Sequence, residues 1–226
     1  MMIVALLPMR HESHRVKQKN YREFNGRPLF HWVLLTLDQC PSITSILIDT
    51  DSPVIKEQAP GVSGKVQVID RPAHLLGDKV PMNDILMHDV GQVKADIYLQ
   101  THSTNPLLEA ETIERAIKTF MQGREKYDSL FSVTRWQTRF WDKEGKAVNH
   151  DPAKLERTQD LPPLFEENSN LYIFTKDVLL KRRNRIGYKP MLFEIPRLEA
   201  TDIDEEEDFK LAENLQRMMS LKQGGI

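Results

Sequence analysis

A group of basic side chains follows the first apolar segment of the chain. Residues 10–22 contain five arginines and lysines against a single glutamate, and two histidines would add charge if protonated. The segment comes directly after a predicted strand, at the edge where an open α/β sheet binds its ligand. Clustered cations at that edge suit a polyphosphate. A solvated basic loop would have the same composition, so charge alone leaves both interpretations open.

Two aspartates near the far end of the chain are candidate ligands for a metal ion. Asp202 and Asp204 are two residues apart, so in an extended segment both side chains face the same side. Mg²⁺ suits such a pair, because it is commonly held by one or two carboxylates together with substrate phosphates. The alternative is a helix start, where carboxylates interact with the positive end of the dipole. That alternative explains the acidic residues 205–207.

Other reactive side chains give weaker signals. His11 and His14 lie three apart in a predicted loop without nearby cysteines, which is poor evidence for a zinc site. The single cysteine, Cys40, cannot form an internal disulfide and has no evident histidine partner. We expect Cys40 to be a small apolar residue on a helix.

The composition is that of an ordinary globular protein. The chain has 226 residues, with 31 lysines and arginines against 33 aspartates and glutamates and a net charge of −2. No general attraction for nucleic acid or anionic membranes is expected. No apolar run approaches the roughly 20 residues that span a bilayer, and residues 1–10 become polar too early for a signal peptide. We therefore expect a cytoplasmic protein without nucleic-acid or membrane partners.

Short apolar segments alternate with amphipathic segments through about residue 121. The predicted strands are residues 3–7, 46–48, 66–69 and 97–100. The predicted helices are residues 28–37, 53–60, 85–90 and 113–120. Such alternation favours a mostly parallel sheet with helices on both faces and a ligand site beyond the carboxyl ends of the strands.

The pattern changes after Asp128. Residues 130–133 and 139–141 resemble strands, and a turn is predicted at 144–146. Residues 149–168 are polar and contain prolines, which favours a long loop or arm. The apolar residues 171–174 return to the sheet.

The last predicted element is a helix over residues 204–219. It has an acidic start and an apolar stripe, which consists of Phe209, Leu211, Ala212 and Leu215. The final Gly224 and Gly225 should fray. No internal repeat is present, and the length suits one domain over residues 1–226.

The order of residues in the basic segment matches a known family. Residues 5–20, ALLPMRHESHRVKQKN, resemble the opening signature of the acylneuraminate cytidylyltransferase (CMP-sialic acid synthetase) family, commonly seen as ARGGSKRVPGKN. The matching positions are Arg10, Ser13, Arg15, Val16, Lys19 and Asn20. Residues 25–34, NGRPLFHWVL, resemble the family's GxPLxxxxI segment.

Downstream segments keep the family order. They are Asp49-Thr50-Asp51, Arg71-Pro72, Leu99-Gln100, Asn105-Pro106-Leu107, residues 157–162 and Glu167-Asn168 with Tyr172-Ile173. Residues 202–209, DIDEEEDF, resemble the family's DIDxxxDF, whose metal-binding aspartates fall on Asp202 and Asp204. For these two aspartates, Mg²⁺ binding is therefore the preferred interpretation. The similarity covers nearly the whole chain.

The resemblance implies a three-layer Rossmann-like α/β nucleotidyltransferase fold with a mostly parallel sheet and a small β/loop dimerisation arm. The implied CTP contacts are Arg10, Ser13, Arg15, Lys19, Asn20 and Arg71. The implied catalytic residues are Arg10, Lys19 and Asp204, and the implied sugar contacts are Gln100, Arg157 and Gln159.

The family is typically dimeric, with an arm that crosses to the neighbouring subunit. By this resemblance we expect a homodimer in which residues 134–168 form the arm. Arg157 and Gln159 would then complete the sugar site of the other subunit. Trp136, Phe140 and Trp141 are predicted interface residues.

The sequence departs from the family pattern in the basic segment. His11 and Glu12 replace two glycines, His14 replaces a lysine and Lys17 replaces a proline. Glycines let a backbone approach phosphate closely. We therefore expect the loop to present its amides differently or to turn Glu12 outward. Farther along, Ser169 replaces another glycine.

The expected reaction is attack of a sugar hydroxyl on the α-phosphorus of CTP, with pyrophosphate leaving. Alignment and charge neutralisation by Mg²⁺, Arg10 and Lys19 would carry most of the catalysis. The expected substrate is an acidic 2-keto sugar of the N-acylneuraminate type, which becomes a CMP-sugar. Two alternatives remain open, namely nucleotidyl transfer with a different sugar or base, and a non-catalytic nucleotide-binding homologue.

Overall fold

The alternating pattern of the first 121 residues folds as a parallel half-sheet. The computed structural model describes residues 1–223, with side chains described through residue 220. Four parallel strands lie in the order β5-β4-β1-β6. Their bounds are Ile3–Leu6 (β1), Ser45–Thr50 (β4), Val66–Asp70 (β5) and Ile97–Gln100 (β6). β1 is paired on both sides and its residues are buried in the core clusters on both faces of the sheet, which explains its continuous apolar run. The four predicted strands are confirmed.

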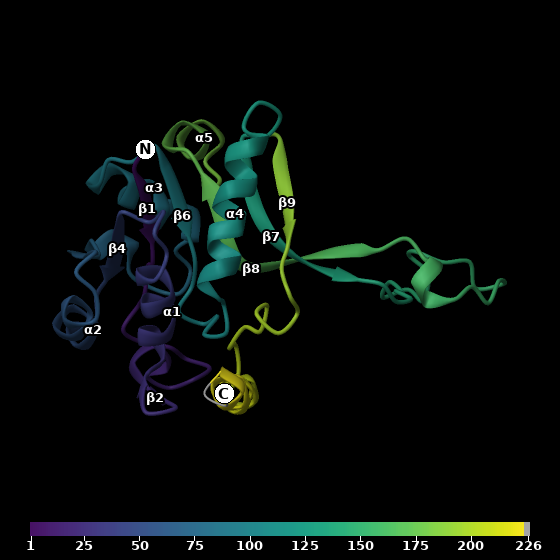
Figure 1. Ribbon diagram of the computed structural model, residues 1–226, viewed down its shortest axis with the longest axis horizontal. Coiled ribbons are helices and arrows are strands. Elements are labelled where there is room, and N and C mark those ends of the chain that lie inside the picture. The colour runs from purple at the N-terminus through teal and green to yellow at the C-terminus, as the bar shows by residue number, and fades with distance from the viewer. Residues whose placement is uncertain (224–226) are drawn as a thin grey trace.

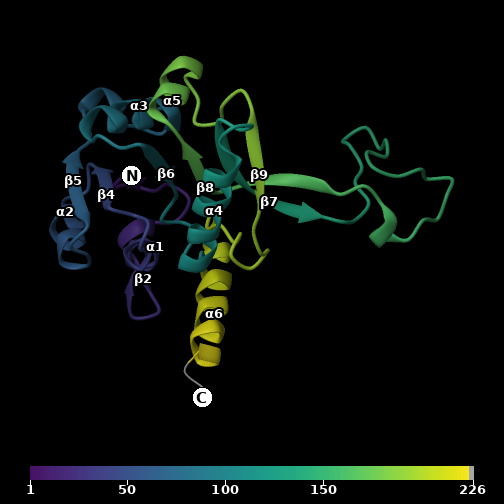
Figure 2. The ribbon, with the colours of Figure 1, turned by 45° about the horizontal axis from the view of Figure 1, so that its top comes forward.

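Helices cover both faces of the sheet, as Figures 1 and 2 show. The helices α1 (Leu29–Asp38), α2 (Pro53–Gln58) and α4 (Ala110–Gly123) pack with the odd-numbered residues of β1 in one core cluster. On the other face, α3 (Met82–Gln92) and α5 (Lys176–Arg182) pack with the even-numbered residues. The two-residue period of a strand separates the two clusters. The helices and the sheet form the predicted three-layer α/β fold.

The other half of the sheet is mixed. β8 (Leu164–Phe174) is antiparallel to β6 and to β7 (Ser129–Trp136), and β9 (Pro190–Glu194) runs parallel to β7 as the seventh strand. The sequence patterns predict neither β9 nor α5. The predicted loop over 149–168 is wrong for residues 164–168, which pair with β7.

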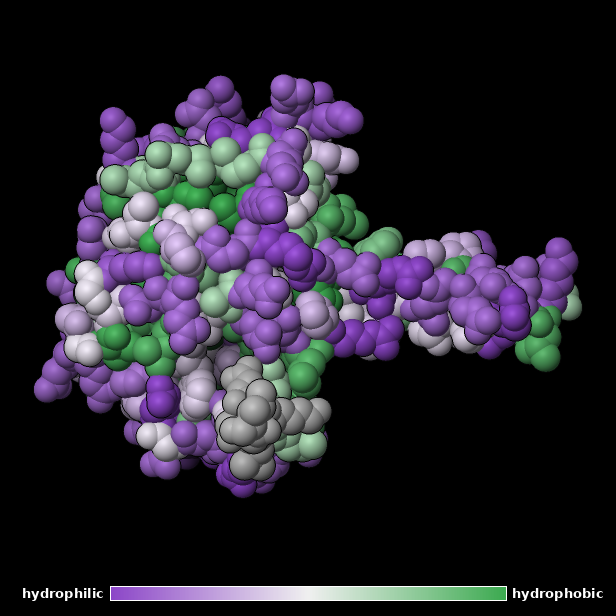
Figure 3. Space-filling model, in the orientation of Figure 1, coloured by the Kyte–Doolittle hydropathy of each residue, from purple (hydrophilic) through white to green (hydrophobic). Residues whose placement is uncertain are grey.

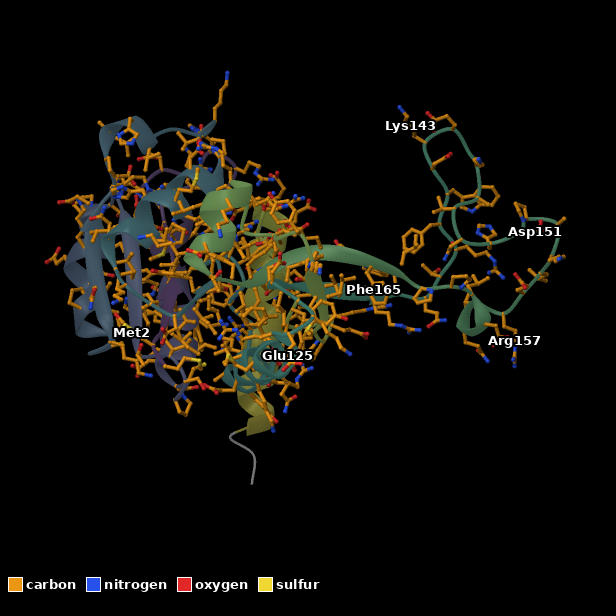
Figure 4. All side chains as sticks on the ribbon, turned by 90° about the horizontal axis from the view of Figure 1, so that it is seen from above. Met2, Glu125, Lys143, Asp151, Arg157 and Phe165 are labelled. Carbon is orange, nitrogen blue, oxygen red and sulfur yellow. The ribbon has the colours of Figure 1, made fainter. Side chains whose placement is uncertain are left out.

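The outer ends of β7 and β8 leave the body of the molecule and carry residues 137–163 as an arm (Figures 1 and 4). Residues 139–141 form no strand, and a single bridge between Trp141 and Ala147 closes the predicted turn. The buried Asn149 organises the arm, since its amide donates to the carbonyls of Thr138 and Pro162. The role of the arm in dimerisation remains a prediction.

The surface of the arm is hydrophilic along most of its length and hydrophobic near its end (Figure 3). Leu155 is 95% exposed and Trp141 is 53% exposed. Removing such apolar side chains from water is favourable, so they suit contact with another surface.

The last helix, α6 (Glu206–Gln223), packs beside the loop that follows β1 and lies apart from the sheet in Figure 2. Its buried face consists of Phe209, Ala212 and Gln216, at helical spacing. Leu211 is 55% exposed, so the predicted apolar stripe is wrong at that position.

The helix α6 shares its core cluster with Ile203 and with Phe24 of the small hairpin formed by β2 (Glu23–Phe24) and β3 (Arg27–Pro28). Gly224 and Gly225 lie outside the described residues. Within residues 1–223, no helix has the length and apolar character needed to cross a membrane.

Candidate active site

A polar pocket of about 310 Å³ opens at the carboxyl edge of the parallel strands. Its walls come from the segments after β1, β5 and β6 and from residues 77–85. Ligands of open α/β sheets bind at this edge. Five of the predicted CTP contacts line the pocket, namely Arg10, Ser13, Lys19, Asn20 and Arg71. Arg15, the sixth, instead faces the acidic segment.

Asn20 fixes the basic loop across the pocket. Its side-chain nitrogen donates to the Arg10 carbonyl over 2.7 Å, and its side-chain oxygen accepts from Ser103 Oγ over 2.7 Å. Because Asn20 is buried, losing either bond would leave a polar atom without a partner. Asn20 thus joins the loop to the segment after β6, and its contact with CTP remains a prediction.

The residues that replace the family's glycines are accommodated locally. The backbone N–H of His11 donates to Asp51 Oδ1 over 2.7 Å, and the ring of His11 stacks on Tyr21. The Glu12 side chain is 76% exposed, which agrees with the expectation that it turns outward. The His11 amide is therefore engaged by a carboxylate, so the loop presents its amides differently from a glycine-rich loop.

Asp78 neutralises the rim of the pocket. It pairs with Arg10, and His14 Nε2 lies 2.5 Å from its other carboxylate oxygen. The side chains of Arg10 and Asp78 are 43% and 48% exposed, so solvent screens this pair and it adds little stability. A phosphate could replace Asp78 as the partner of Arg10 at small cost.

Arg71 is held much more firmly. Its Nε donates to Asp49 Oδ1 over 2.5 Å and its Nη2 donates to the Asp49 carbonyl over 3.0 Å, with both side chains buried. Burial, and then the charge of Asp49, raises the pKa of Asp89 to about 9. A proton on Asp89 supplies a donor for the Asp49 carboxylate. The pair then carries one negative charge, which matches Arg71.

His88 lies beside the same two carboxyl groups. Potential ligand atoms of Asp49, His88 and Asp89 lie within 4.8 Å of one another. Because Arg71 already neutralises the carboxyl pair, we assign Asp49 and Asp89 to holding Arg71 in place.

The acidic segment near the end of the chain lies beside the basic loop. Lys19 Nζ donates to the Ile203 carbonyl over 2.6 Å, and Arg15 Nη2 lies 2.5 Å from Asp204 Oδ1. The buried Ile203 side chain, in the core cluster under the loop, fixes this approach. Burial lowers the pKa of Lys19, and the charges of Asp202 and Asp204 oppose that shift. The two regions that the sequence assigns to one nucleotide are therefore adjacent.

Asp202 and Asp204 differ in exposure. The Asp204 side chain is 52% exposed, whereas Asp202 is largely enclosed. Asp202 Oδ1 is buried without a hydrogen-bond partner among the described residues. An orphaned carboxylate oxygen beside a second carboxylate suits a hard cation. The residues present therefore fit Mg²⁺, and its binding remains a prediction.

Gln100 lies behind the pocket wall. It is fully buried; its Oε1 accepts from Arg185 Nη1 over 2.6 Å, and its Nε2 lies 3.0 Å from His102 Nε2. His102 lines the pocket. Burial, and then the charges of Arg185 and Lys19, lowers the pKa of His102 to about 3, so this ring is neutral. Gln100 thus reaches the pocket through His102, and its contact with a sugar remains a prediction.

Sequence reasoning misses Arg185. Its guanidinium carbon lies 3.5 Å from the centroid of the Tyr172 ring, next to Gln100. It belongs to the run KRRNR over residues 181–185, whose composition is that of a solvated loop. Only the pairing of β6 with β8, which places Gln100 opposite Tyr172, gives Arg185 its neighbours.

Ser169 shows why a glycine suits its position. Its φ is 57°, in the left-handed region that glycine adopts without steric cost. Its hydroxyl lies 3.2 Å from the Tyr172 hydroxyl, whose single proton is donated to Glu167, so Ser169 is the donor of this second hydrogen bond. The departure from the family pattern therefore adds a polar contact beside Arg185.

Arg157 and Gln159 lie on the arm and not at the pocket. Figure 4 shows Arg157 at the end of the arm, well away from the body. Arg157 Nε donates to Asp160 over 2.8 Å, and the Gln159 carbonyl accepts from Gln137. Neither residue can serve the pocket of its own chain, so their role at a sugar site requires a second subunit and remains a prediction.

Comparisons with known proteins agree with this arrangement. A family model described as cytidylyltransferase matches residues 4–225. The chain is 28% identical over 231 residues to post-translational flagellin modification protein B of Campylobacter coli, with 97% of each chain covered. It is 26% identical to CMP-N,N'-diacetyllegionaminic acid synthase of Campylobacter jejuni, with 97% of each chain covered. It is 23% identical to pseudaminic acid cytidylyltransferase of the same species, over 95% of this chain and 96% of the relative.

Solved structures share the fold. A CMP:2-keto-3-deoxy-manno-octonic acid synthetase, determined with CTP, has a TM-score of 0.69 at 15% identity, over 97% of this chain and all of that one. The 4-diphosphocytidyl-2C-methyl-D-erythritol synthase from Anaerococcus prevotii has a TM-score of 0.66 at 12% identity, over 96% of each chain. These likenesses confirm the predicted nucleotidyltransferase fold. The match over residues 4–225 identifies the chain as a nucleotidyltransferase that belongs to the cytidylyltransferase family.

Proposed function

We propose that this protein transfers CMP from CTP to an acidic 2-keto sugar. A hydroxyl oxygen of the sugar forms a bond to the α-phosphorus, the bond from that phosphorus to pyrophosphate breaks, and the hydroxyl proton is lost. The products are a CMP-sugar and pyrophosphate. The relatives named for legionaminic and pseudaminic acids, together with the fold shared with an octonic acid synthetase, support an acidic sugar as the acceptor.

The observation that carries the proposal is the contact between the basic loop and the acidic segment. Lys19, which lines the pocket, donates to the Ile203 carbonyl over 2.6 Å, and Ile203 separates the two aspartates. Cations for a triphosphate and carboxylates for its metal therefore lie on the same rim. Phosphoryl and nucleotidyl transfer depend mainly on such alignment and charge neutralisation.

The pocket residues would have different roles, according to how firmly each side chain is held. Arg10 and Lys19 would bind the phosphates, since Arg10 can exchange Asp78 for a ligand oxygen. The buried Arg71 would stay fixed on Asp49 and orient the nucleotide. Mg²⁺ held by Asp202 and Asp204 would neutralise phosphate charge and lower the pKa of a bound hydroxyl.

We further propose that the protein works as a homodimer joined through its arms. The exposed apolar residues near the end of the arm support an interface, and Arg157 and Gln159 could reach a sugar only in a second subunit. Each active site would then combine the pocket of one chain with the arm of its partner.

Pyrophosphate release tests the proposed reaction. The protein is incubated with Mg²⁺, one of four nucleoside triphosphates and one sugar from a panel of N-acetylneuraminate, legionaminate, pseudaminate and 3-deoxy-manno-octulosonate. We expect release only with CTP and an acidic sugar, and no release when EDTA is added. N-acetylmannosamine, which lacks a carboxylate, is the matched control. Pyrophosphate release with that neutral sugar would contradict the proposal. So would the absence of release with every acidic sugar in the panel.

A further inference from the structure

Arg185 is an arginine beside the pocket that the proposed phosphate and metal sites leave unused. It follows α5 in a segment that is tied to α3, because the Arg185 backbone N–H donates to Asn83 Oδ1 over 3.1 Å. Its side chain turns inward and covers the Tyr172 ring at 3.5 Å, while Nη1 donates to Gln100 Oε1 over 2.6 Å. The guanidinium is therefore held at the end of β6, where the Gln100 side chain also contacts His102 of the pocket wall.

The charge of Arg185 is not balanced by a carboxylate. Among the described residues, no ion pair involves Arg185, whereas Arg10, Arg15 and Arg71 each pair with an aspartate. Its contacts are neutral, namely the Gln100 amide and the Tyr172 ring. The Tyr172 hydroxyl donates to the exposed Glu167, a carboxylate whose charge acts on Arg185 without forming an ion pair with it. A half-buried cation without an anionic partner is costly to retain unless it meets an anion.

The neighbouring groups make this position attractive to an anion. His102 is neutral, and the charges of both Arg185 and Lys19 contribute to lowering its pKa, so two fixed cations lie close to this uncharged ring. The guanidinium has five N–H donors in a planar fork, and Gln100 takes one of them. The free part of such a fork matches the two oxygens of a carboxylate.

We propose that Arg185 binds the carboxylate of the acidic sugar, within the same chain that holds the nucleotide. The inference rests on the proposed function, and it names the group that makes the enzyme select an acid. Gln100 then acts as a positioning residue, because it holds Nη1 and leaves the remaining guanidinium donors available for a ligand. The arm of the partner subunit would contact other parts of the sugar.

The test compares Arg185→Gln with the wild type, using the panel sugar that the wild type converts and the methyl ester of that sugar. Loss of the charged hydrogen bonds should raise KM for the acid about 10- to 100-fold. KM for CTP should stay within about twofold of the wild-type value, since the triphosphate contacts are unchanged. The wild type should prefer the acid to its ester, and the variant should treat the two alike.

Two further variants separate binding from folding. Arg185→Lys keeps the charge but loses the fork, so it should raise KM for the acid less than Arg185→Gln does. Arg182→Gln is the matched control, because Arg182 also lies over a tyrosine, the exposed Tyr188, at 4.6 Å on the outer surface. That variant should behave as the wild type. Thermal unfolding of all three variants shows whether each one is folded.

The outcomes distinguish the two proposals. A wild type that converts acidic sugars, with an Arg185→Gln variant that keeps its preference for the acid, would overturn the role of Arg185 alone. Equal rises in KM for CTP and sugar would also overturn it, because they indicate a structural role. A wild type that converts no acidic sugar would refute the proposed function, and the role of Arg185 would fall with it.

Discussion

The two ends of the candidate site balance their cations in different ways. At the phosphate end, Arg10, Arg15 and Arg71 each face an aspartate of the same chain. At the other end, Arg185 faces an amide and an aromatic ring. Both ends lie at the carboxyl edge of one sheet, so the difference comes from the loops and not from the fold.

The difference indicates how each end would meet its ligand. The pairs of Arg10 and Arg15 are about half exposed, so each is weak and can exchange its partner for a phosphate. Arg71 is the exception, because its pair is buried and a variant that broke it would leave a charge uncompensated. Arg185 has no such partner to release. The arginines at the phosphate end would exchange their aspartates for phosphate oxygens, whereas Arg185 already lacks an anionic partner. This difference would suit an order in which CTP binds first and the sugar binds second.

The largest expected effect is a loss of kcat when a predicted metal ligand at the phosphate end is removed. Asp204→Ala should lower kcat by about 10³-fold or more, because charge stabilisation in the transition state would be lost. The exposed Asp204 supports no core contact, so thermal unfolding should change little. Pyrophosphate release measures the rate. Glu207→Ala, an exposed acidic change in the same segment, is the control, and near-normal turnover of Asp204→Ala would count against the mechanism.

The next effect tests whether the sugar end includes the arm of a partner subunit. Arg157→Ala should lower activity about 100-fold, because a charged contact with the substrate would be lost. Mixing it with inactive Asp204→Ala should restore about a quarter of the wild-type activity, since random dimers then contain intact composite sites. Lys143→Ala, another exposed change on the arm, is the control. If mixing restores no activity, the arm does not complete a site in its partner.

A smaller effect sharpens the assignment of the triphosphate. Lys19→Ala should raise KM for CTP about 10-fold, because one charged contact with the phosphates is lost, with a smaller change in KM for the sugar. Initial rates over a range of CTP concentrations measure this. Lys17→Ala removes an exposed positive charge from the same loop and serves as the control. An unchanged response to CTP would show that Lys19 does not handle the triphosphate.

The smallest expected effect concerns Asp89, which supports Arg71 through Asp49. It appears in the pH dependence of the free energy of unfolding. Asp89 has a pKa of about 9 in the folded protein, so it keeps a proton that the unfolded chain releases near pH 4. Its contribution therefore falls as pH rises between these values, by at most about 1.4 kcal/mol per pH unit. Asp89→Asn, which still has a donor for Asp49, should flatten that decline.

Urea unfolding at pH 6 and pH 8 measures the free energy for both proteins. Asp49, His88 and Arg71 are the titratable or charged groups beside Asp89, and none of them is changed in the variant. Identical slopes for the wild type and Asp89→Asn would show that Asp89 is ionised in the folded protein.

The parallel half of the fold could be predicted because burial on both faces leaves a direct signature. Continuous apolar runs mark β1 and β4, and the intervening helices show their period. The mixed half gives weaker signals. The outer part of β8 includes Glu166 and Glu167, which pair with Thr134 and Val133 outside the body. Backbone pairing orders that segment without burying its side chains, so hydrophobicity cannot reveal it.

The site was predictable to a similar degree. Motif order identified the residues on the basic loop and the two aspartates, and the structure brings these regions together. The resemblance could not indicate that the backbone N–H of His11 donates a hydrogen bond to Asp51, because that bond depends on the path of two loops. Arg185 was missed for the same reason. Its neighbours are set by strand pairing and by its tie to Asn83, which no local spacing encodes.

A crystal structure with CTP and Mn²⁺ in place of Mg²⁺ would show whether the basic loop and the two aspartates hold one nucleotide and its metal ion. Anomalous scattering locates the ion independently of any assumption about its ligands. We expect an ion about 2.1 Å from carboxylate oxygens of Asp202 and Asp204 and from a phosphate oxygen, with the triphosphate against Arg10 and Lys19. A nucleotide in the pocket whose metal touches neither aspartate would contradict it.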